Sequence, residues 1–237
     1  QDKNWKSANN KLDYFFSVYN WMSFKEKWSL FTKDTLKKID NDKELINFWE
    51  KDFEYTEDGN VYDQILYMFQ KNHLICLLDR LDSMSMSAGV EARVPFVDHE
   101  LVEFVTKIPI NYKLKWKSYG SKLQSLFSNA FSFSEKLDIT KYLLRKIGLD
   151  ILPPSIPERK KKGFPVPLDD WINNGMIEYA KEILLSDRTT RRRIFKKDEI
   201  LKLINNDQKL DYDFWRKKIW MLINVEIWFR EFIDVDS

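Results

Sequence analysis

The sequence has little cysteine, histidine or glycine, and each scarcity excludes a kind of site. A single cysteine, Cys76, rules out an internal disulfide and is typical of a reducing cytoplasm, where we expect this protein. The two histidines, His73 and His99, are too far apart for the usual metal-binding spacings. The six glycines are spread so widely that no two lie within ten residues of each other. Loops that cradle phosphates normally need clustered glycines, so the sequence predicts none here.

Neither sign of charge dominates the chain. Lysine and arginine number 39 and aspartate and glutamate 37, giving a formal net charge of +2. A balance this even argues against a nucleic-acid binder, and the basic run at 191–193 is best interpreted as a solvated turn. No stretch approaches the roughly 18 apolar residues of a membrane span, and residues 1–5 do not resemble a signal peptide. We therefore expect neither a nucleic-acid partner nor a membrane.

Apolar residues, by contrast, recur at helical spacing along most of the 237 residues. A long, mostly buried helix is expected at 61–81, and a second helix from the N-cap Asp98 to Pro109. Further helices are expected at 121–131, 140–147, 168–185, 197–205 and 212–232, the last being apolar nearly all round and thus a core helix. The sequence predicts a mostly α fold: a single helical unit over 1–237, with a helical lead-in at 1–60 and the motifs at 61–237.

Two irregular segments, 83–97 and 149–167, interrupt this pattern and are where chemistry is expected. In the first, the apolar residues Val90, Val94 and Phe96 are expected to anchor an extended piece of chain. Such an anchor would hold the charged pair Glu91 and Arg93 on a rigid support. Spacing alone leaves open an ordinary solvated surface pair.

The second irregular segment follows a helix on which Lys141 and Arg145 are expected to share one face. Four consecutive cations come next, at 159–162, and the residues Gly163-Phe164-Pro165 constrain the loop that carries them. Clustered cations on a constrained loop suit a polyphosphate or another anion. A solvated basic run is the alternative that composition alone leaves open.

Together these segments resemble the signatures of the asparagine synthase family. The stretch 82–98 contains M-S-M and V-E-A-R-V-P-F-V-D, and K-Y-L-L-R at 141–145 and R-K-K-K-G-F-P-V-P at 159–167 follow in the family's order. The family's tail is similar to R-I-F at 193–195 and to I-W-M-L and E-I-W within 219–228. The resemblance implies the helical C-terminal portion of an ATP-pyrophosphatase (adenine nucleotide alpha hydrolase-like) synthetase domain, with its nucleotide-binding sheet largely absent from this chain.

The resemblance also implies a reaction. In this family MgATP adenylates a substrate carboxylate, pyrophosphate leaves, and an amine or ammonia attacks the acyl-adenylate. Glu91 matches the glutamate that helps the incoming amine lose a proton, and Lys161 matches the lysine that faces the reacting carbonyl and the departing pyrophosphate. Lys141 matches another lysine near the polyphosphate. The choice of Lys161 among three adjacent lysines depends on counting back from Gly163 and Phe164.

Three departures from the family pattern qualify this reading. The S-G-G-x-D-S loop that holds ATP is absent, and so is the N-terminal cysteine nucleophile of the glutaminase domain. We therefore expect a larger enzyme that supplies the nucleotide loop and the glutaminase in cis or in trans, while this chain alone is inactive and binds ATP weakly. A stretch rich in Ser and Phe at 117–138 is not expected in an ordinary asparagine synthetase, and it puts the acceptor in doubt.

Asparagine synthesis from aspartate and glutamine-derived ammonia is the reaction that the resemblance favours. Amidation or cyclisation of another carboxylate acceptor, such as a sugar acid, a peptide or a β-amino acid precursor, is an alternative within the family. A non-catalytic helical remnant or scaffold is the alternative from another class. An upstream Gly-rich loop in the same gene would discriminate the enzyme from the remnant.

Overall fold

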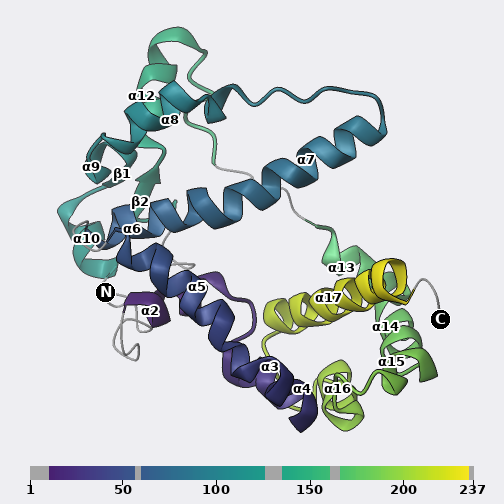
Figure 1. The fold of residues 1–237 in the computed structure, drawn as a ribbon. Coiled ribbons are helices and arrows are strands. Elements are labelled where there is room, and N and C mark those ends of the chain that lie inside the picture. Colours follow the sequence, from purple (N-terminus) through teal and green to yellow (C-terminus); the bar gives the residue numbers. More distant parts are fainter. Residues whose placement is uncertain (1–10, 57–59, 126–134, 161–165, 235–237) are drawn as a thin grey trace. The chain divides into compact units, whose positions relative to one another are not determined.

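The computed structural model describes residues 11–56, 60–125, 135–160 and 166–234 (Figure 1). Its residues group into two compact units. The first unit comprises 1–18 with 49–163, and the second comprises 19–48 with 164–237. The mostly helical fold that the sequence predicts is confirmed. The sequence also predicts a single unit, with a lead-in at 1–60 and the motifs at 61–237. This division stays a prediction.

The first unit consists of helices and one short two-stranded sheet. Its elements are α2 (Lys11–Tyr19), the end of α5 (Lys43–Glu54), α6 (Val61–Met68), the π-helical η2 (Phe69–Leu74), α7 (Ile75–Ser87), η3 (Pro95–Val97), α8 (His99–Thr106), α9 (Ile110–Lys113), β1 (Leu114–Trp116), α10 (Tyr119–Ser125), β2 (Asp138–Thr140) and α12 (Tyr142–Ile151). The two strands are antiparallel, with Leu114 opposite Thr140 and Trp116 opposite Asp138. Neither strand was predicted from the sequence, because three residues are too few to show an alternating pattern.

An aromatic cluster around Phe15 forms the core of the first unit. The Phe15 ring lies 5.4 to 5.9 Å from the rings of Trp49, Phe53 and Phe69. Met68, on the adjoining helix α6, is fully buried. These contacts explain why the long helical segment that begins with α6 is buried in its first part.

The prediction that this helix is mostly buried as far as residue 81 is wrong. Ile75, Leu77 and Leu81 on α7 are all exposed. Apolar periodicity marks the face of a helix that can be covered, but it carries no information on whether another element covers it. The helix itself is present, and it continues to Ser87.

The second unit is built around α17. Its elements are α3 (Phe24–Leu30), α4 (Lys33–Lys38), η1 (Asp40–Asp42), the start of α5, α13 (Leu168–Trp171), η4 (Ile172–Met176), α14 (Ile177–Leu184), α15 (Asp187–Arg191), α16 (Lys197–Ile204), α17 (Tyr212–Trp228) and η5 (Phe229–Ile233). Figure 1 shows α17 packed beside α14. Ile219, Leu222 and Ile223 of α17 are buried against α14 and α16 residues such as Ile183 and Ile200. The predicted core helix is confirmed on this face, whereas Phe214 and Trp228 remain about half exposed.

A buried ionic network joins α17 to α15. The Glu226 carboxylate, with an exposed fraction of 0%, accepts hydrogen bonds from Arg192 (Nη1, 2.6 Å; Nη2, 3.0 Å) and from Arg230 (Nε, 2.6 Å). Burial raises the pKa of Glu226, but these hydrogen bonds outweigh it, so its pKa lies below the ordinary value. The expectation of a solvated turn at 191–193 is therefore wrong for Arg192, which the network holds in the interior.

Asp234 completes the network, and it should make the second unit sensitive to acid. Hydrogen bonds from Arg192 and Arg188 lower the pKa of Asp234 to about 2, from 3.8. A lowered native pKa stabilises the fold above pH 3.8, and this stabilisation is lost as the pH falls toward 2. We expect Asp234→Asn to lower the thermal unfolding midpoint at pH 6 and to lower it progressively less as the pH falls below 4.

Thermal unfolding followed by circular dichroism from pH 6 to pH 2 measures this difference. Glu182→Gln, which removes an exposed acid from α14, is the matched control and should show no such convergence. A constant gap between wild type and Asp234→Asn across the titration would contradict the prediction.

Among the helices of the described ranges, none is long and apolar enough to cross a membrane.

Candidate functional site

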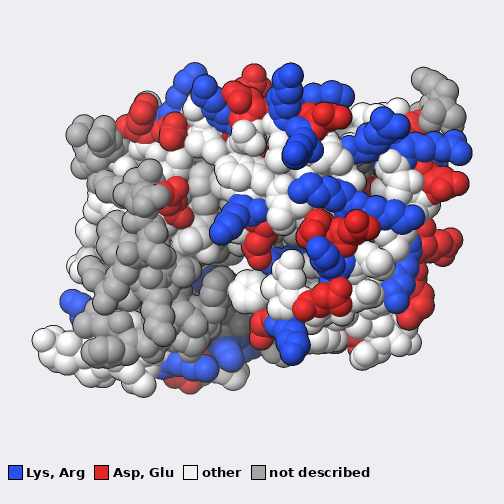
Figure 2. Space-filling model, turned by 90° about the horizontal axis from the view of Figure 1, so that it is seen from below, with Lys and Arg blue, Asp and Glu red and all other residues white. Residues whose placement is uncertain are grey.

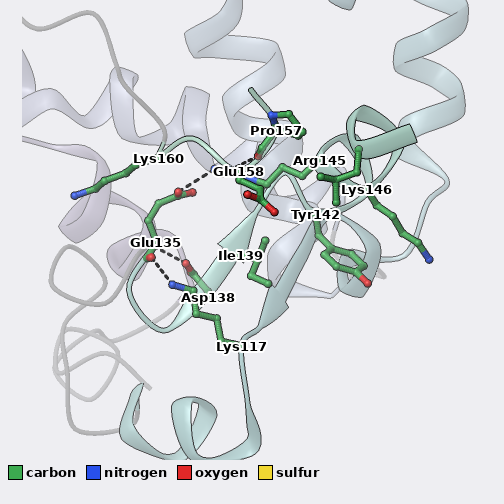
Figure 3. A pocket seen from close by; sticks show the side chains of 11 residues that line it. Lys117, Glu135, Asp138, Ile139, Tyr142, Arg145, Lys146, Pro157, Glu158 and Lys160 are labelled. Carbon is green, nitrogen blue, oxygen red and sulfur yellow. Dashed lines mark hydrogen bonds and ion pairs between the residues drawn. The ribbon is translucent and has the colours of Figure 1, made fainter. Parts of the chain in front are cut away.

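A cavity of about 510 Å³ lies in the first unit, where β2, α12 and the segment 157–160 meet (Figure 3). It is lined by Lys117, Glu135, Asp138, Ile139, Tyr142, Arg145, Lys146, Leu149, Pro157, Glu158 and Lys160. The segment that resembles the family's K-Y-L-L-R signature thus shares a cavity wall with the beginning of the lysine run. This juxtaposition makes the cavity the candidate functional site.

Arg145 lies at the centre of the cavity wall. Its guanidinium donates hydrogen bonds to the backbone oxygens of Thr140 (2.9 Å), Pro157 (2.7 Å) and Arg159 (2.8 Å). It also forms an ion pair with Glu135, Nη2 to Oε2, at 2.9 Å. The side chain connects strand β2, the turn before it and the chain that leads into the lysine run.

Side chains of Lys117, Asp138 and Thr140 form hydrogen bonds with the turn before β2. The backbone N–H of Glu135, a residue with φ of 63°, donates to Oδ1 of the buried Asp138 at 2.6 Å. Lys117 donates through Nζ to the backbone oxygens of Glu135 (2.7 Å) and Lys136 (2.9 Å). The hydroxyl of Thr140 donates to the Glu135 carboxylate. The polar groups of this turn are largely engaged within the protein.

Three charged side chains at the rim, by contrast, are exposed: Lys146, Glu158 and Lys160. Beside them, a hydrogen bond from the Lys115 ammonium to the Tyr142 hydroxyl lowers the pKa of Tyr142. Exposed ammonium groups at the mouth of a partly apolar cavity can attract an anionic ligand and orient it.

The predicted pairing of Lys141 and Arg145 on one helical face is wrong. Lys141 precedes α12 as its N-cap residue, with a left-handed backbone (φ 54°), and its side chain is exposed. Arg145 instead turns toward backbone carbonyls of the chain at 157–159. Lys141 is adjacent to the cavity in sequence, but its side chain is not among the residues that line it.

Glu91 lies in the connection between α7 and α8 and is not among the residues that line the cavity. It pairs with Arg93 at 2.7 Å, with side-chain exposed fractions of 66% and 81% respectively. The expectation that Val90, Val94 and Phe96 anchor this segment is wrong, because all three are exposed. Lys161 falls outside the described residues. The roles of Glu91, Lys141 and Lys161 stay predictions.

Three residues that line the cavity were not predicted from the sequence: Lys117, Glu135 and Asp138. All three belong to the stretch 117–138, which the sequence marks as unusual for its Ser and Phe content and as a doubt about the acceptor, but not through these three residues. No spacing pattern identifies them, because Lys117 and Asp138 contact backbone groups of a turn and Glu135 pairs with Thr140 and Arg145. Among the described residues, no cluster of three or more His, Cys, Asp or Glu side chains could hold a metal ion.

Charges of both signs mix on the face of the molecule that Figure 2 draws. Lysines and arginines lie beside aspartates and glutamates across the described residues of this face. A nucleic-acid backbone is recognised by a concentrated basic surface rather than by such a mixture. The absence of a nucleic-acid partner stays a prediction.

The chain is similar to known proteins over most of its length. The sequence profile of the family described as asparagine synthase matches residues 3–230. Asparagine synthetase [glutamine-hydrolyzing] 1 of Bacillus subtilis (strain 168) is 33% identical over 152 residues, which cover 64% of this chain and 20% of that protein. Asparagine synthetase [glutamine-hydrolyzing] 3 of the same organism is 27% identical over 237 residues, covering 93% of this chain and 35% of that protein.

A fungal relative carries a different name. Amidase chyE of Penicillium rubens is 27% identical over 142 residues, which cover 55% of this chain and 19% of that protein. No solved structure matches. The chain spans well under half of the length of each of these three relatives.

Proposed function

The chain belongs to the asparagine synthase family, and on that premise we propose that it is the helical part of an enzyme that forms an amide at the expense of ATP. The proposed reaction proceeds through an acyl-adenylate: ATP, with Mg²⁺, activates a carboxylate and pyrophosphate leaves, and ammonia then attacks the activated carbonyl, loses a proton and displaces AMP. The proposed fold context is the C-terminal portion of an ATP-pyrophosphatase-type synthetase domain. The observation that carries the proposal is the family match over 3–230, which includes all the signature segments in order.

Asparagine synthesis is the version of this reaction that the relatives support best. The acceptor would be aspartate, and a glutaminase domain elsewhere in the enzyme would release the ammonia from glutamine. The nucleotide loop would likewise come from another part of the enzyme, in cis or in trans, and the site of action would be the cytoplasm. Glu91 would accept a proton from the attacking amine. Lys161 and Lys141 would stabilise the charge that develops on the carbonyl and phosphate oxygens.

A different carboxylate acceptor is the second candidate, and two observations favour it. The stretch 117–138 contributes Lys117, Glu135 and Asp138 to the candidate cavity. The chain is also similar to a protein named amidase rather than asparagine synthetase. An acceptor larger than aspartate would be activated by the same chemistry, since only the group attached to the carboxylate changes.

Product analysis of the complete polypeptide tests both candidates. With aspartate, glutamine and MgATP, we expect asparagine and pyrophosphate in equal amounts, and ammonia should replace glutamine. Mass spectrometry detects the amide, and an enzyme-coupled assay detects the pyrophosphate.

Three results distinguish the hypotheses. Pyrophosphate release that depends on another carboxylate, with none from aspartate, would select the second candidate. A complete enzyme, with its nucleotide-loop segment in cis or supplied in trans, that releases neither pyrophosphate nor an amide with any acceptor, even when ammonia is supplied, would refute the proposal and favour a non-catalytic remnant. Pyrophosphate release without any acceptor would contradict the amide-forming step.

A further inference from the structure

Arg145 joins three stretches of chain that are separate in the sequence, and we propose that it is a positioning residue for the lysine run. It would fix the chain at 157–160, which leads into Lys161, against the turn at 135–140. The inference rests on the proposed function, because it assigns Arg145 an effect on the reaction that acts through its neighbours.

The hydrogen bonds of Arg145 account for this role. A guanidinium is a rigid planar group with five N–H donors, and here it meets four acceptors at 2.7 to 2.9 Å. Two of those acceptors, the carbonyls of Pro157 and Arg159, share Nη1 and belong to the three residues before Lys160. A lysine has a single nitrogen, so it cannot reach the carbonyls of Thr140 and Arg159 and the carboxylate of Glu135 in this arrangement.

The charge of Arg145 is also compensated inside the protein. Arg145 and Glu135 have side-chain exposed fractions of 18% and 14%, so the pair is largely shielded from water. Removing one partner of such a pair leaves the other charge poorly solvated. Arg145 therefore differs from Lys146 and Lys160, whose ammonium groups are exposed at the rim. Its donors face the protein, which suits a positioning role rather than direct binding of phosphate.

A positioning role predicts a particular kinetic signature. A displacement of the reacting groups by about 1 Å can reduce the rate on the order of 10²-fold without removing any contact to the substrate. Arg145→Lys in the complete enzyme should therefore reduce kcat by roughly 10- to 100-fold and leave KM for ATP nearly unchanged. Glu135→Gln keeps Arg145 and its carbonyl contacts, so it should cause a smaller loss of the same kind.

Trypsin provides a second measurement that does not depend on activity. Arg159 and Lys160 offer trypsin two cleavage sites, which Arg145 should protect by holding the carbonyls of Pro157 and Arg159. Loss of hydrogen bonds to a charged donor favours local opening, so cleavage in Arg145→Lys should be at least about tenfold faster. Mass spectrometry would locate the cut bonds. Arg191→Lys, at an exposed arginine of α15, is the matched control and should leave both cleavage and kcat as in the wild type.

The outcomes separate this inference from the proposed function. Wild-type rates of cleavage after Arg159 and Lys160 and of amide formation in Arg145→Lys would overturn the positioning role. A raised KM for ATP with unchanged kcat and unchanged cleavage would overturn it as well, since it would identify a ligand-binding residue. If the wild type forms no amide at all, the proposed function fails, while the cleavage comparison still decides whether Arg145 holds the loop. If Arg145→Lys does not fold, the same two measurements on Glu135→Gln decide the matter.

Discussion

Glu91→Gln in the complete enzyme should slow amide formation on the order of 10²- to 10⁴-fold while leaving ATP binding nearly unchanged. The amine that attacks an acyl-adenylate must lose a proton, and a positioned carboxylate can accept it. Glutamine has almost the same shape as glutamate but cannot serve as a base at neutral pH. The loss should therefore appear in kcat for the amide-forming step, measured with saturating ammonia and MgATP.

The structure supplies a control on this result. Glu91 pairs with Arg93 at an exposed position, and exposed pairs contribute about 0 to 1 kcal/mol to stability. Glu91→Gln should therefore leave the unfolding midpoint nearly unchanged, so that lost activity cannot be attributed to unfolding. Glu103→Gln, which removes an exposed carboxylate from α8, should preserve turnover. An unchanged turnover number in Glu91→Gln would show that Glu91 only forms a surface pair.

Helices were predictable from the sequence where their signals are local. The side chain of Asp98 accepts a hydrogen bond from the backbone N–H of Leu101, which is the N-cap that the sequence predicts. Helix α16 at Lys197–Ile204 lies within the predicted range 197–205. Strands β1 and β2 were missed because each forms only by pairing with residues more than twenty positions away, such as Leu114 with Thr140.

The candidate site was predictable only in part. Motif order identified the segments at 141–145 and 159–167, and the structure brings Arg145 and Lys160 to one cavity. The partners of Arg145 could not be predicted, because three of them are backbone carbonyls. Every residue carries a carbonyl, so its use as an acceptor leaves no trace in the residue type. For the same reason the turn at Glu135 showed no signal, although it forms one wall of the cavity.

Lys161→Ala should slow pyrophosphate release far more than Lys160→Ala or Lys162→Ala. A lysine that contacts a reacting oxygen stabilises the charge that develops there, and its loss should raise the barrier by roughly 3 kcal/mol. This corresponds to a rate loss on the order of 10²-fold. The neighbouring lysines carry the same charge but would contribute only to the local field. Lys160 lies exposed at the cavity rim, where solvent screens its charge.

The comparison of the three variants discriminates between two physical models. Each loses one positive charge from the same run, so a purely electrostatic attraction of the polyphosphate predicts equal losses that shrink together as salt increases. A specific contact predicts that Lys161→Ala alone shows the large loss and that this loss persists at high salt. Pyrophosphate release should be measured for the three variants side by side at low and high ionic strength. Equal losses would show that the lysine run attracts the polyphosphate only through its summed charge. The assignment of Lys161 would then be wrong.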